Sequence, residues 1–347
     1  KRYYPFSSIG SHVLGYMNQN ENSGTNKVGA MGVEAGYEDA LSGELGRVVT
    51  STNGWGQEMI SGYEMYFDAE NGYDVHITMD ERIQAMLEQT LVEGIETYDV
   101  QAGAFGIVMD PQIGAVLAMA SSPDFDPNNW NAILSQELQA QIDQVAAEKG
   151  EDSEEMGAAW RAAWNKQMRN RTLDETYEPG SVFKPITVSI GLEEGIISLD
   201  STYSCGGGKT VGGRTISCHK RGGHGQQNLT KAVGNSCNVA LMNIAEQIGP
   251  EITWKYWKDF GLLEKTGIDL SGEEKGIFWD EDYFKSLPAS ESQELATSSF
   301  GQRFKVTPIE MITAFAAVIN GGHLLQPYLV QSIADGDGNT VFYHETT

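Results

Sequence analysis

The apolar residues of the chain change their spacing along the sequence, and each change predicts a different element. Residues 74–78 alternate between polar and apolar side chains, as a half-buried β-strand does. Residues 104–120 contain two apolar runs separated by the turn-forming residues 110–114, so they predict a β-hairpin. Residues 201–228 are rich in Gly, Cys and His with little periodicity, which is typical of a long loop.

Two places have the spacing of a helix-initiating capping box, in which Thr is followed three residues later by Glu. Thr78 and Glu81 predict a helix whose apolar face is formed by Ile83, Met86, Leu87 and Leu91. Thr307 and Glu310, with Pro308 at the first helical position, predict a late helix. Its buried residues are expected to be Ile312, Phe315, Ala316 and Ile319.

Further helices are expected from helical spacing alone, one beginning at Ser181 and one near Ser236. Residues 133–169 are acidic and rich in Gln and Ala, so they predict an inserted pair of surface helices broken at Gly150. Strands and helices mix without a repeated β-α-β order. The predicted fold class is therefore α+β.

Composition and charge exclude several functions. The chain has 23 Lys and Arg against 48 Asp and Glu, a net charge of −25, which argues against binding to nucleic acid or to anionic lipid. An apolar fraction of 40% with seven Trp excludes a disordered chain. No window of eighteen apolar residues occurs, so no transmembrane helix is expected within the sequence.

Ser181 and Lys184 form a Ser-x-x-Lys pattern, which on a helix places a hydroxyl and an amine on the same face. A serine nucleophile can use a lysine as its base if the amine is neutral. Apolar neighbours and the positive end of a helix would both lower the pKa of Lys184. Pro185 also fits the first turn of a helix. A second instance, Ser217 to Lys220, lies in the Gly-rich stretch, where residues three apart need not face each other.

Ser236 and Asn238 form a Ser-x-Asn pattern that follows Ser181 by 55 residues (236 − 181). Its hydroxyl can relay a proton between the lysine and a leaving amine, and its amide can hold a peptide group. The same pattern at residues 51–53 lies in a stretch rich in Gly, Ser and Thr, and it predicts only a turn.

These motifs resemble the class B penicillin-binding proteins. Residues 174–185 are similar to the active-site segment of that family, and residues 223–225 with 235–240 resemble its second active-site box. Further segments resemble the family in the same order, namely residues 37–46, 106–111, 118–123, 299–302 and 306–308.

The resemblance implies a penicillin-binding, serine β-lactamase-like transpeptidase fold, in which an antiparallel sheet is flanked by helices. Residues 1–70 would be the remnant of an N-terminal pedestal or dimerisation domain, and residues 71–347 the transpeptidase domain. Four catalytic roles are implied: Ser181 as the nucleophile, Lys184 as its base, Ser236 as the proton relay and Asn238 as the anchor of the donor stem peptide.

The implied activity is D,D-transpeptidation of peptidoglycan, in which a D-Ala-D-Ala stem peptide acylates Ser181 and the acyl group passes to an amine of a neighbouring strand. β-Lactams would acylate the same serine. A membrane glycosyltransferase of wall synthesis is the expected partner, in elongation, division or sporulation. The expected location is the extracytoplasmic face of a bacterial membrane, through an N-terminal anchor outside this sequence. The alternatives are a serine β-lactamase or β-lactam sensor, and a catalytically degenerate wall scaffold.

The family's third box, Lys-Thr-Gly, is expected beyond the late helix. The Lys-Thr-Gly of this sequence, Lys265 to Gly267, comes 29 residues after Ser236 (265 − 236) and before that helix. We expect it to have a structural role in a loop away from the cleft. The transpeptidase domain is accordingly expected to be truncated before its third box, and the fragment to have poor activity.

The three cysteines, Cys205, Cys218 and Cys237, lie close in sequence to His224 with the spacing Cys-x12-Cys-x5-His-x12-Cys. Three thiolates and an imidazole are a ligand set that tetrahedral Zn²⁺ prefers. A subset of the family carries zinc beside the second box, so the resemblance adds to the expectation of a structural zinc, with no organic cofactor. A Cys205–Cys218 disulfide is the alternative, and His219 is an alternative ligand to His224.

Overall fold

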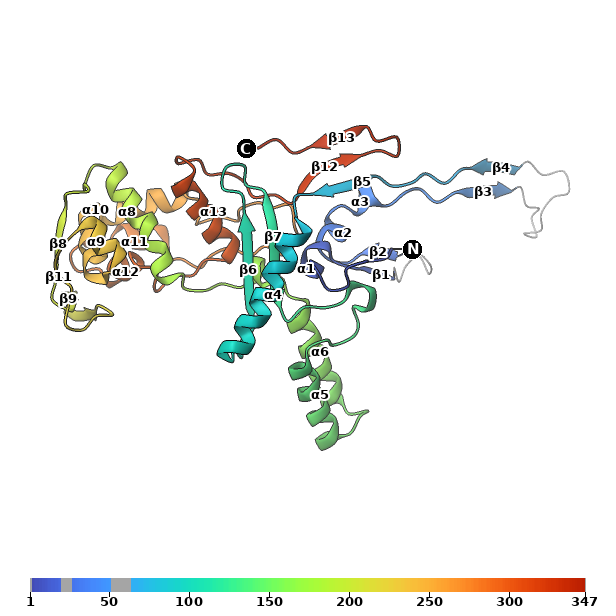
Figure 1. The fold of residues 1–347 in the computed structure, drawn as a ribbon, viewed down its shortest axis with the longest axis horizontal. Helices are drawn as coiled ribbons and strands as arrows, with labels where there is room; N and C mark the ends of the chain where they lie inside the picture. The colour runs from blue at the N-terminus through green and yellow to red at the C-terminus, as the bar shows by residue number, and fades with distance from the viewer. Residues whose placement is uncertain (1, 20–26, 51–63, 347) are drawn as a thin grey trace.

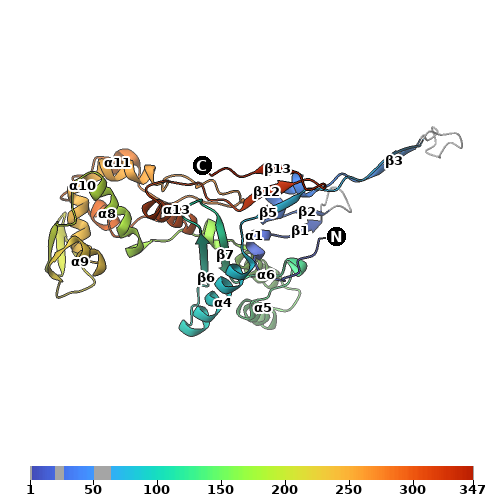
Figure 2. The same cartoon turned by 45° about the horizontal axis from the view of Figure 1, so that its top comes forward.

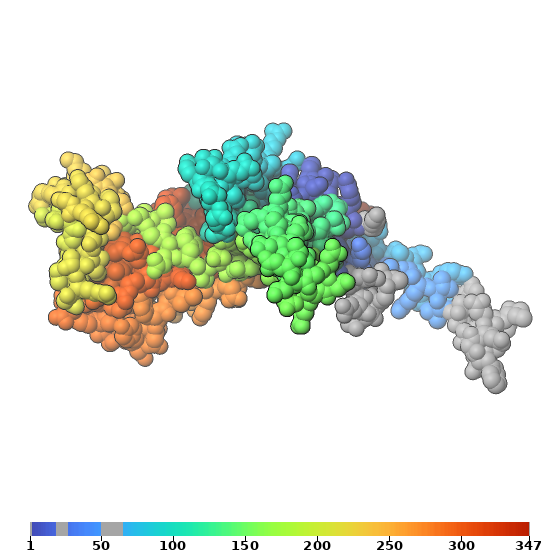
Figure 3. All heavy atoms as spheres, turned by 90° about the horizontal axis from the view of Figure 1, so that it is seen from below, coloured from blue at the N-terminus to red at the C-terminus, as the bar shows by residue number. Residues whose placement is uncertain are grey.

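The structure is a computed structural model that describes residues 2–19, 27–50 and 64–346. The molecule is elongated, with the N-terminal residues toward one end and a helical lobe at the other (Figures 1 and 3). Strands β3 (Arg47–Thr50) and β4 (Glu64–Phe67) pair antiparallel and project away from the body (Figures 1 and 2). The Ser-x-Asn pattern at residues 51–53 lies outside the described residues. The other N-terminal elements are α1 (Ser11–Leu14), β1 (Met17–Gln19), β2 (Lys27–Gly29), α2 (Gly32–Gly36) and α3 (Glu38–Leu41).

A three-stranded sheet joins the first part of the chain to its last part. Strand β5 (Asp74–Ile77) pairs with β12 (Val330–Ala334), which also pairs with β13 (Thr340–Tyr343). The register places Ile77 opposite Val330. The strand predicted over residues 74–78 is therefore confirmed.

The centre of the molecule is the hairpin of β6 (Ala104–Met109) and β7 (Val116–Ser122), as the sequence predicts. Helices α4 (Glu81–Tyr98) and α13 (Pro308–Ile319) pack against it. Helix α13 begins with the predicted capping box, because the Thr307 hydroxyl accepts from the Glu310 amide and the Glu310 carboxylate accepts from the Thr307 amide. Its predicted buried face is wrong at Ile319, which is 58% exposed in the last turn.

The predicted start of α4 at a Thr78 capping box is wrong. Asp80 is the N-cap, and its carboxylate accepts from the amides of Arg82 and Ile83. A carboxylate is stabilised at the positive end of a helix, while the Thr78 hydroxyl donates to the Val116 carbonyl at 2.6 Å and so joins the hairpin. The predicted apolar face is also only partly buried, since Met86 is 69% exposed.

Helices α5 (Gln136–Lys149) and α6 (Glu154–Met168) form the inserted pair predicted over residues 133–169, with Gly150 between them. The pair projects from the body (Figure 1). It buries a small core of its own around Leu138 and Ile142. The insertion is thus a separate helical hairpin on the surface.

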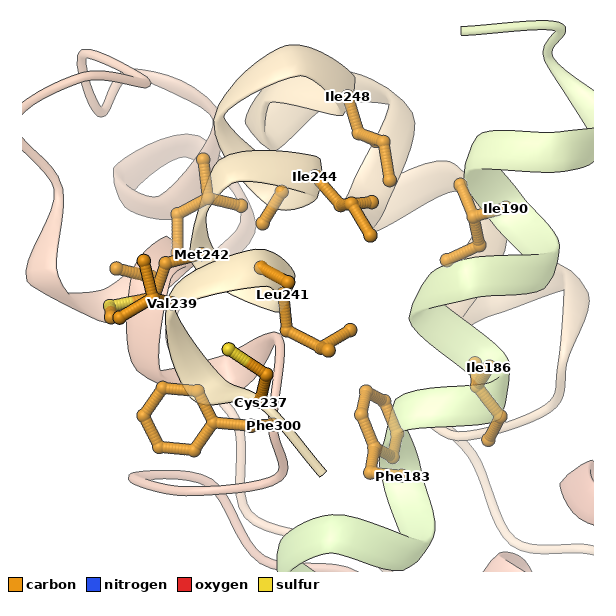
Figure 4. Close-up of a cluster of buried hydrophobic side chains, with 14 of the residues drawn as sticks. Phe183, Ile186, Ile190, Cys237, Val239, Leu241, Met242, Ile244, Ile248 and Phe300 are labelled. Atoms are coloured by element: carbon orange, nitrogen blue, oxygen red, sulfur yellow. The ribbon is translucent and has the colours of Figure 1, made fainter. Parts of the chain in front are cut away.

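The helical lobe contains the largest hydrophobic core, built between α8 (Lys184–Glu193) and α10 (Asn238–Asp259). Ile186 and Ile190 of α8 belong to this core together with Leu241 and Ile244 of α10, and Ile190 lies toward Ile244 (Figure 4). The other α-helices of the described residues are α7 (Arg171–Asp174), α9 (Leu229–Gly234), α11 (Glu281–Lys285) and α12 (Gln293–Ser298). This core holds together the two helices that carry the catalytic patterns.

Residues 201–228 are more regular than the loop predicted for them. They contain four short strands, β8 (Thr202–Cys205), β9 (Gly208–Val211), β10 (Arg214–Ser217) and β11 (Gly225–Asn228). Strand β8 pairs with β11 and β9 pairs with β10. Lys209 contacts Asn243 and Glu246, which attaches the β9–β10 hairpin to α10. Each of these strands has only four residues, which is too short for an alternation of apolar and polar side chains to stand out in the sequence.

All strand pairs among the described residues are antiparallel. Together with the interspersed helices they confirm the predicted α+β class. Over the same residues, the helices are too short or too polar to cross a membrane.

The contact between α8 and α10 should dominate the stability of the lobe. Leu241 has no exposed surface, so Leu241→Ala should lower the free energy of unfolding by about 3 kcal/mol through lost burial and a residual cavity. Leu199, which is 67% exposed, gives the matched control, and Leu199→Ala should change stability by about 0.5 kcal/mol or less. Urea unfolding followed by tryptophan fluorescence measures both, and equal effects would show that this contact is not central.

Candidate active site

Ser181 and Lys184 lie at the start of the lobe's first long helix. Residues Gly180–Phe183 form a 3₁₀ turn, and the α-helix α8 begins at Lys184 and not at Ser181 as predicted. Residues three apart are eclipsed in a 3₁₀ turn, so the hydroxyl and the amine still share one side. Pro185 sits in the first turn of α8, as the sequence predicts. Ser181 is exposed, whereas Lys184 is only 2% exposed.

Ser236 occupies the sharp reversal between α9 and α10. Its φ of 49° is left-handed, which is uncommon for a residue other than Gly. Helix α10 begins at Asn238 with Cys237 as its N-cap, two residues later than the predicted start. The reversal directs both the carbonyl and the hydroxyl of Ser236 toward Lys184.

The amine of Lys184 connects the two patterns. Its Nζ lies 2.7 Å from the Ser236 carbonyl oxygen, 2.7 Å from Ser236 Oγ and 2.8 Å from Asn238 Oδ1. Ser236 Oγ in turn lies 2.9 Å from Ser181 Oγ. The four predicted catalytic residues are therefore brought together, and the hydrogen bonds of the described residues connect Lys184 to Ser181 through the Ser236 hydroxyl.

The surroundings of Lys184 favour its neutral form. Burial lowers the pKa of Lys184 below the ordinary lysine value, while the nearby Cys218 and Cys237 act in the opposite direction. A neutral amine has two N–H groups, and the Ser236 carbonyl and Asn238 Oδ1 can only accept hydrogen bonds. The lone pair of the neutral amine then faces the Ser236 hydroxyl. The arrangement can pass a proton from Ser181 through Ser236 to Lys184.

The four predicted metal ligands also meet in space. Cys205 Sγ, Cys218 Sγ, a ring nitrogen of His224 and Cys237 Sγ lie within 4.8 Å of one another, and the cysteines are buried. Cys218 Sγ is 3.7 Å from His224 Nδ1. Zinc bonds of about 2.0–2.3 Å place neighbouring ligand atoms roughly 3.5–3.8 Å apart in a tetrahedron. The 3.7 Å between Cys218 Sγ and His224 Nδ1 matches that spacing, and three thiols with an imidazole are a donor set that suits zinc. All three thiols are free, and the structure contains no Cys205–Cys218 disulfide.

The cluster of three cysteines and His224 lies directly beside the Ser236 and Asn238 pattern. Cys237 lies between Ser236 and Asn238 in the sequence, and the backbone amides of Asn238 and Val239 donate to Cys218 Sγ. The pairing of β8 with β11 places Cys205 opposite Gly225, the residue after His224. His219 is also near, with its Nδ1 3.8 Å from Cys218 Sγ.

Two contacts of this site were not predicted from the sequence, because both involve main-chain atoms. The Ser236 carbonyl accepts from Lys184, and the Ser217 carbonyl accepts from Asn238 Nδ2 at 3.5 Å. The second Ser-x-x-Lys pattern, beginning at Ser217, spans the end of β10 and the following turn, so it lies on no helix.

The Lys-Thr-Gly at Lys265 to Gly267 lies in a loop. The Glu273 carboxylate accepts from the amide of Thr266 at 2.6 Å and from the amide of Gly267 at 3.1 Å. The Gly267 carbonyl accepts from the side chain of Gln326. These contacts fit the structural role predicted for this tripeptide.

The chain matches two family models. Residues 104–347 match the penicillin-binding protein transpeptidase domain, and residues 1–77 match the penicillin-binding protein dimerisation domain. The sequence is 36% identical to Stage V sporulation protein D of Bacillus subtilis, over 96% of this chain and 45% of the relative. It is 27% identical to the peptidoglycan D,D-transpeptidase MrdA of Escherichia coli, over 98% of this chain and 52% of the relative.

A solved structure agrees with these matches. Penicillin-binding protein PBP2 of Helicobacter pylori, in its complex with MreC, aligns with a TM-score of 0.70 and 26% identity, over 96% of this chain and 60% of that one. The chain spans about half the length of the curated relatives it matches. It belongs to the class B penicillin-binding proteins, with a dimerisation domain followed by a transpeptidase domain.

Proposed function

We propose that this protein is a serine D,D-transpeptidase that cross-links peptidoglycan stem peptides and is acylated by β-lactams. The observation that carries the proposal is the hydrogen-bonded series Ser181 Oγ, Ser236 Oγ and Lys184 Nζ, with separations of 2.9 and 2.7 Å. An exposed hydroxyl connected to a buried amine is the arrangement that an activated serine nucleophile requires.

In the first step Ser181 Oγ attacks the carbonyl carbon of the penultimate D-Ala. Its proton passes to Ser236 Oγ, and the Ser236 proton passes to the neutral amine of Lys184. The carbon–nitrogen bond to the terminal D-Ala then breaks, and the leaving nitrogen takes a proton back through Ser236. The products are an acyl-enzyme on Ser181 and free D-Ala, with Lys184 neutral again.

In the second step an amine of a neighbouring stem peptide attacks the acyl carbon. The amine loses its proton to the same relay, the bond to Ser181 Oγ breaks and Ser181 recovers its proton. Asn238 accepts from Lys184 through Oδ1 and donates one Nδ2 hydrogen to the Ser217 carbonyl, so its second Nδ2 hydrogen is the donor that remains to hold the carbonyl of the donor peptide. Asn238 would thereby link the position of the donor to that of the base.

The setting in the cell is also part of the proposal. The relatives include a sporulation protein and MrdA, and the similar PBP2 structure is a complex with another protein. We propose action at the extracytoplasmic face of a bacterial membrane, beside a membrane glycosyltransferase of wall synthesis.

A β-lactam should form a stable adduct on Ser181 of the full-length protein, because the proposed transpeptidase hydrolyses its penicilloyl ester slowly. Intact mass spectrometry with benzylpenicillin should show the added mass, and Ser181→Ala should remove it. Ser217→Ala, which changes the other Ser-x-x-Lys pattern, is the matched control and should keep it. Rapid turnover of the drug would favour a β-lactamase, and an unlabelled native protein would favour a wall scaffold.

The acylation rate should rise with pH and level off below pH 10.5, the ordinary lysine pKa, because burial lowers the pKa of Lys184 and only the neutral amine accepts a proton. The titratable groups that act on its pKa are the thiols of Cys218 and Cys237. Lys184→Arg, which stays protonated, should lower the rate by about 10²- to 10⁴-fold. Lys285→Arg, at a surface ion pair with Glu281, should leave it unchanged. A rate independent of pH would contradict the assignment, as would an active Lys184→Arg variant.

We also propose that Cys205, Cys218, His224 and Cys237 hold a structural zinc ion. The support is the compact donor set itself, with three buried thiols and an imidazole. The ion would fix the short strands β8–β11 to the start of α10, and so support the position of the second active-site box.

Purified protein should contain about one zinc per chain by mass spectrometry of the metal. His224→Ala should lower the zinc content and the melting temperature, because it removes one of four ligands. His219→Ala is the matched control for a neighbouring imidazole, and it should keep the metal. Metal-free protein with a Cys205–Cys218 disulfide would overturn the proposal.

A further inference from the structure

Residues 299–306, here called the strap, run beside the segment that carries the nucleophile. Tyr177 and Val306 exchange two backbone hydrogen bonds of 3.0 Å. The Gly180 amide donates to the Gly301 carbonyl at 2.8 Å. Further along, the Thr187 hydroxyl donates to the Ser299 carbonyl at 2.9 Å. The strap therefore contacts the nucleophile segment before and after Ser181.

Gly301 makes the closest approach between the two segments. Its φ is 78°, and a Cβ at this position would lie 2.1 Å from the Gly180 carbonyl oxygen. Both the backbone conformation and the contact exclude a side chain. The Gly180 backbone, directly before Ser181, therefore rests on the strap.

Glu178 adds a second support across the same turn. Its Oε1 accepts from the backbone amide of Arg303 at 2.9 Å. Arg303 has a φ of 70°, a left-handed conformation that is costly for a residue other than Gly. A strained residue persists when its surroundings hold it, and the Glu178 carboxylate is one of the groups that do so here.

Aromatic side chains of the lobe's hydrophobic core hold the strap on its inner side. Phe304 packs edge-on against Phe183, with ring centroids 4.8 Å apart, and Phe183 lies between Ser181 and Lys184. Phe304 also packs against Trp257 of α10, with ring centroids 5.6 Å apart. The strap is thus fixed to the core on one side and to the turn before the nucleophile on the other.

We propose that Glu178 and Gly301 are positioning residues that hold the Ser181 turn at hydrogen-bonding distance from Ser236. This inference rests on the proposed acylation of Ser181. Neither residue contacts the Lys184 amine, and they act through the backbone that carries the nucleophile. Small displacements of a nucleophile have large effects on rate, since a misplacement of about 1 Å can cost roughly a hundredfold.

The test measures acylation of the full-length protein by a fluorescent penicillin, separating drug binding from the first-order acylation step. Glu178→Ala should slow that step about tenfold and change drug binding less than about twofold. Glu178→Gln keeps an oxygen acceptor for the Arg303 amide, so it should stay within about threefold of the native rate. Rates are taken on the fraction that labels, so loss of folded protein alone would not slow them.

Glu148→Ala is the matched control, because Glu148 is an exposed glutamate of α5 that accepts one hydrogen bond from Gln144 at 3.0 Å. It should acylate at the native rate. A native rate in Glu178→Ala, or an equal loss in the Gln and Ala variants, would overturn the positioning role while leaving the proposed function intact. If the native protein itself fails to label with the penicillin, both the proposed function and the positioning role would be overturned.

Gly301→Ala provides an independent variant. The added methyl group should push the Gly180 backbone away and lower the acylation rate more than a hundredfold. Gly267→Ala, at another left-handed glycine in a loop, should keep the native acylation rate. A Gly301→Ala variant that labels at the native rate would count against the strap, whereas a variant that does not fold leaves the Glu178 series to decide.

Discussion

The buried amine of Lys184 is the constraint on which the rest of the site depends. Lys184 is only 2% exposed, so its amine must find hydrogen-bond partners within the protein, and here they are two oxygens of Ser236 and one of Asn238. To supply two of the three, Ser236 adopts a left-handed conformation between two helices. Cys237, the next residue, is both the N-cap of α10 and a member of the cluster of three cysteines and His224. One lysine thus accounts for the geometry of the whole second box.

Much of this arrangement could be predicted from the sequence, because its signals are local. The hairpin over residues 104–120, the capping box at Thr307 and the placement of Ser181 and Lys184 on one side of a helical turn each depend on residues a few positions apart. The meeting of the cysteines with His224 was also predicted, from ligand chemistry together with a family resemblance and not from periodicity.

The rest could not be predicted because it depends on contacts between distant residues. Thr78 and Asp80 are both good N-caps, and the choice follows from a hydrogen bond of Thr78 to Val116 in a different element. Strand β8, which ends at Cys205, forms by pairing with β11, which begins at Gly225. The left-handed conformation of Ser236 directs its carbonyl oxygen to the amine of Lys184, which lies 52 residues away in the sequence. A window of the sequence contains none of these partners.

The sheet of β5, β12 and β13 has a consequence for how the chain reaches its folded state. Ile77 pairs with Val330, so β5 emerges from the ribosome long before its partner strand has been made. During that interval its backbone N–H and C=O groups are unpaired, and an open strand edge is a template for aggregation. Closing so large a loop is slow, because the entropy of the intervening chain is lost before the pairing compensates for it. Synthesis of the residues between β5 and the end of β13 at Tyr343 therefore precedes completion of this sheet.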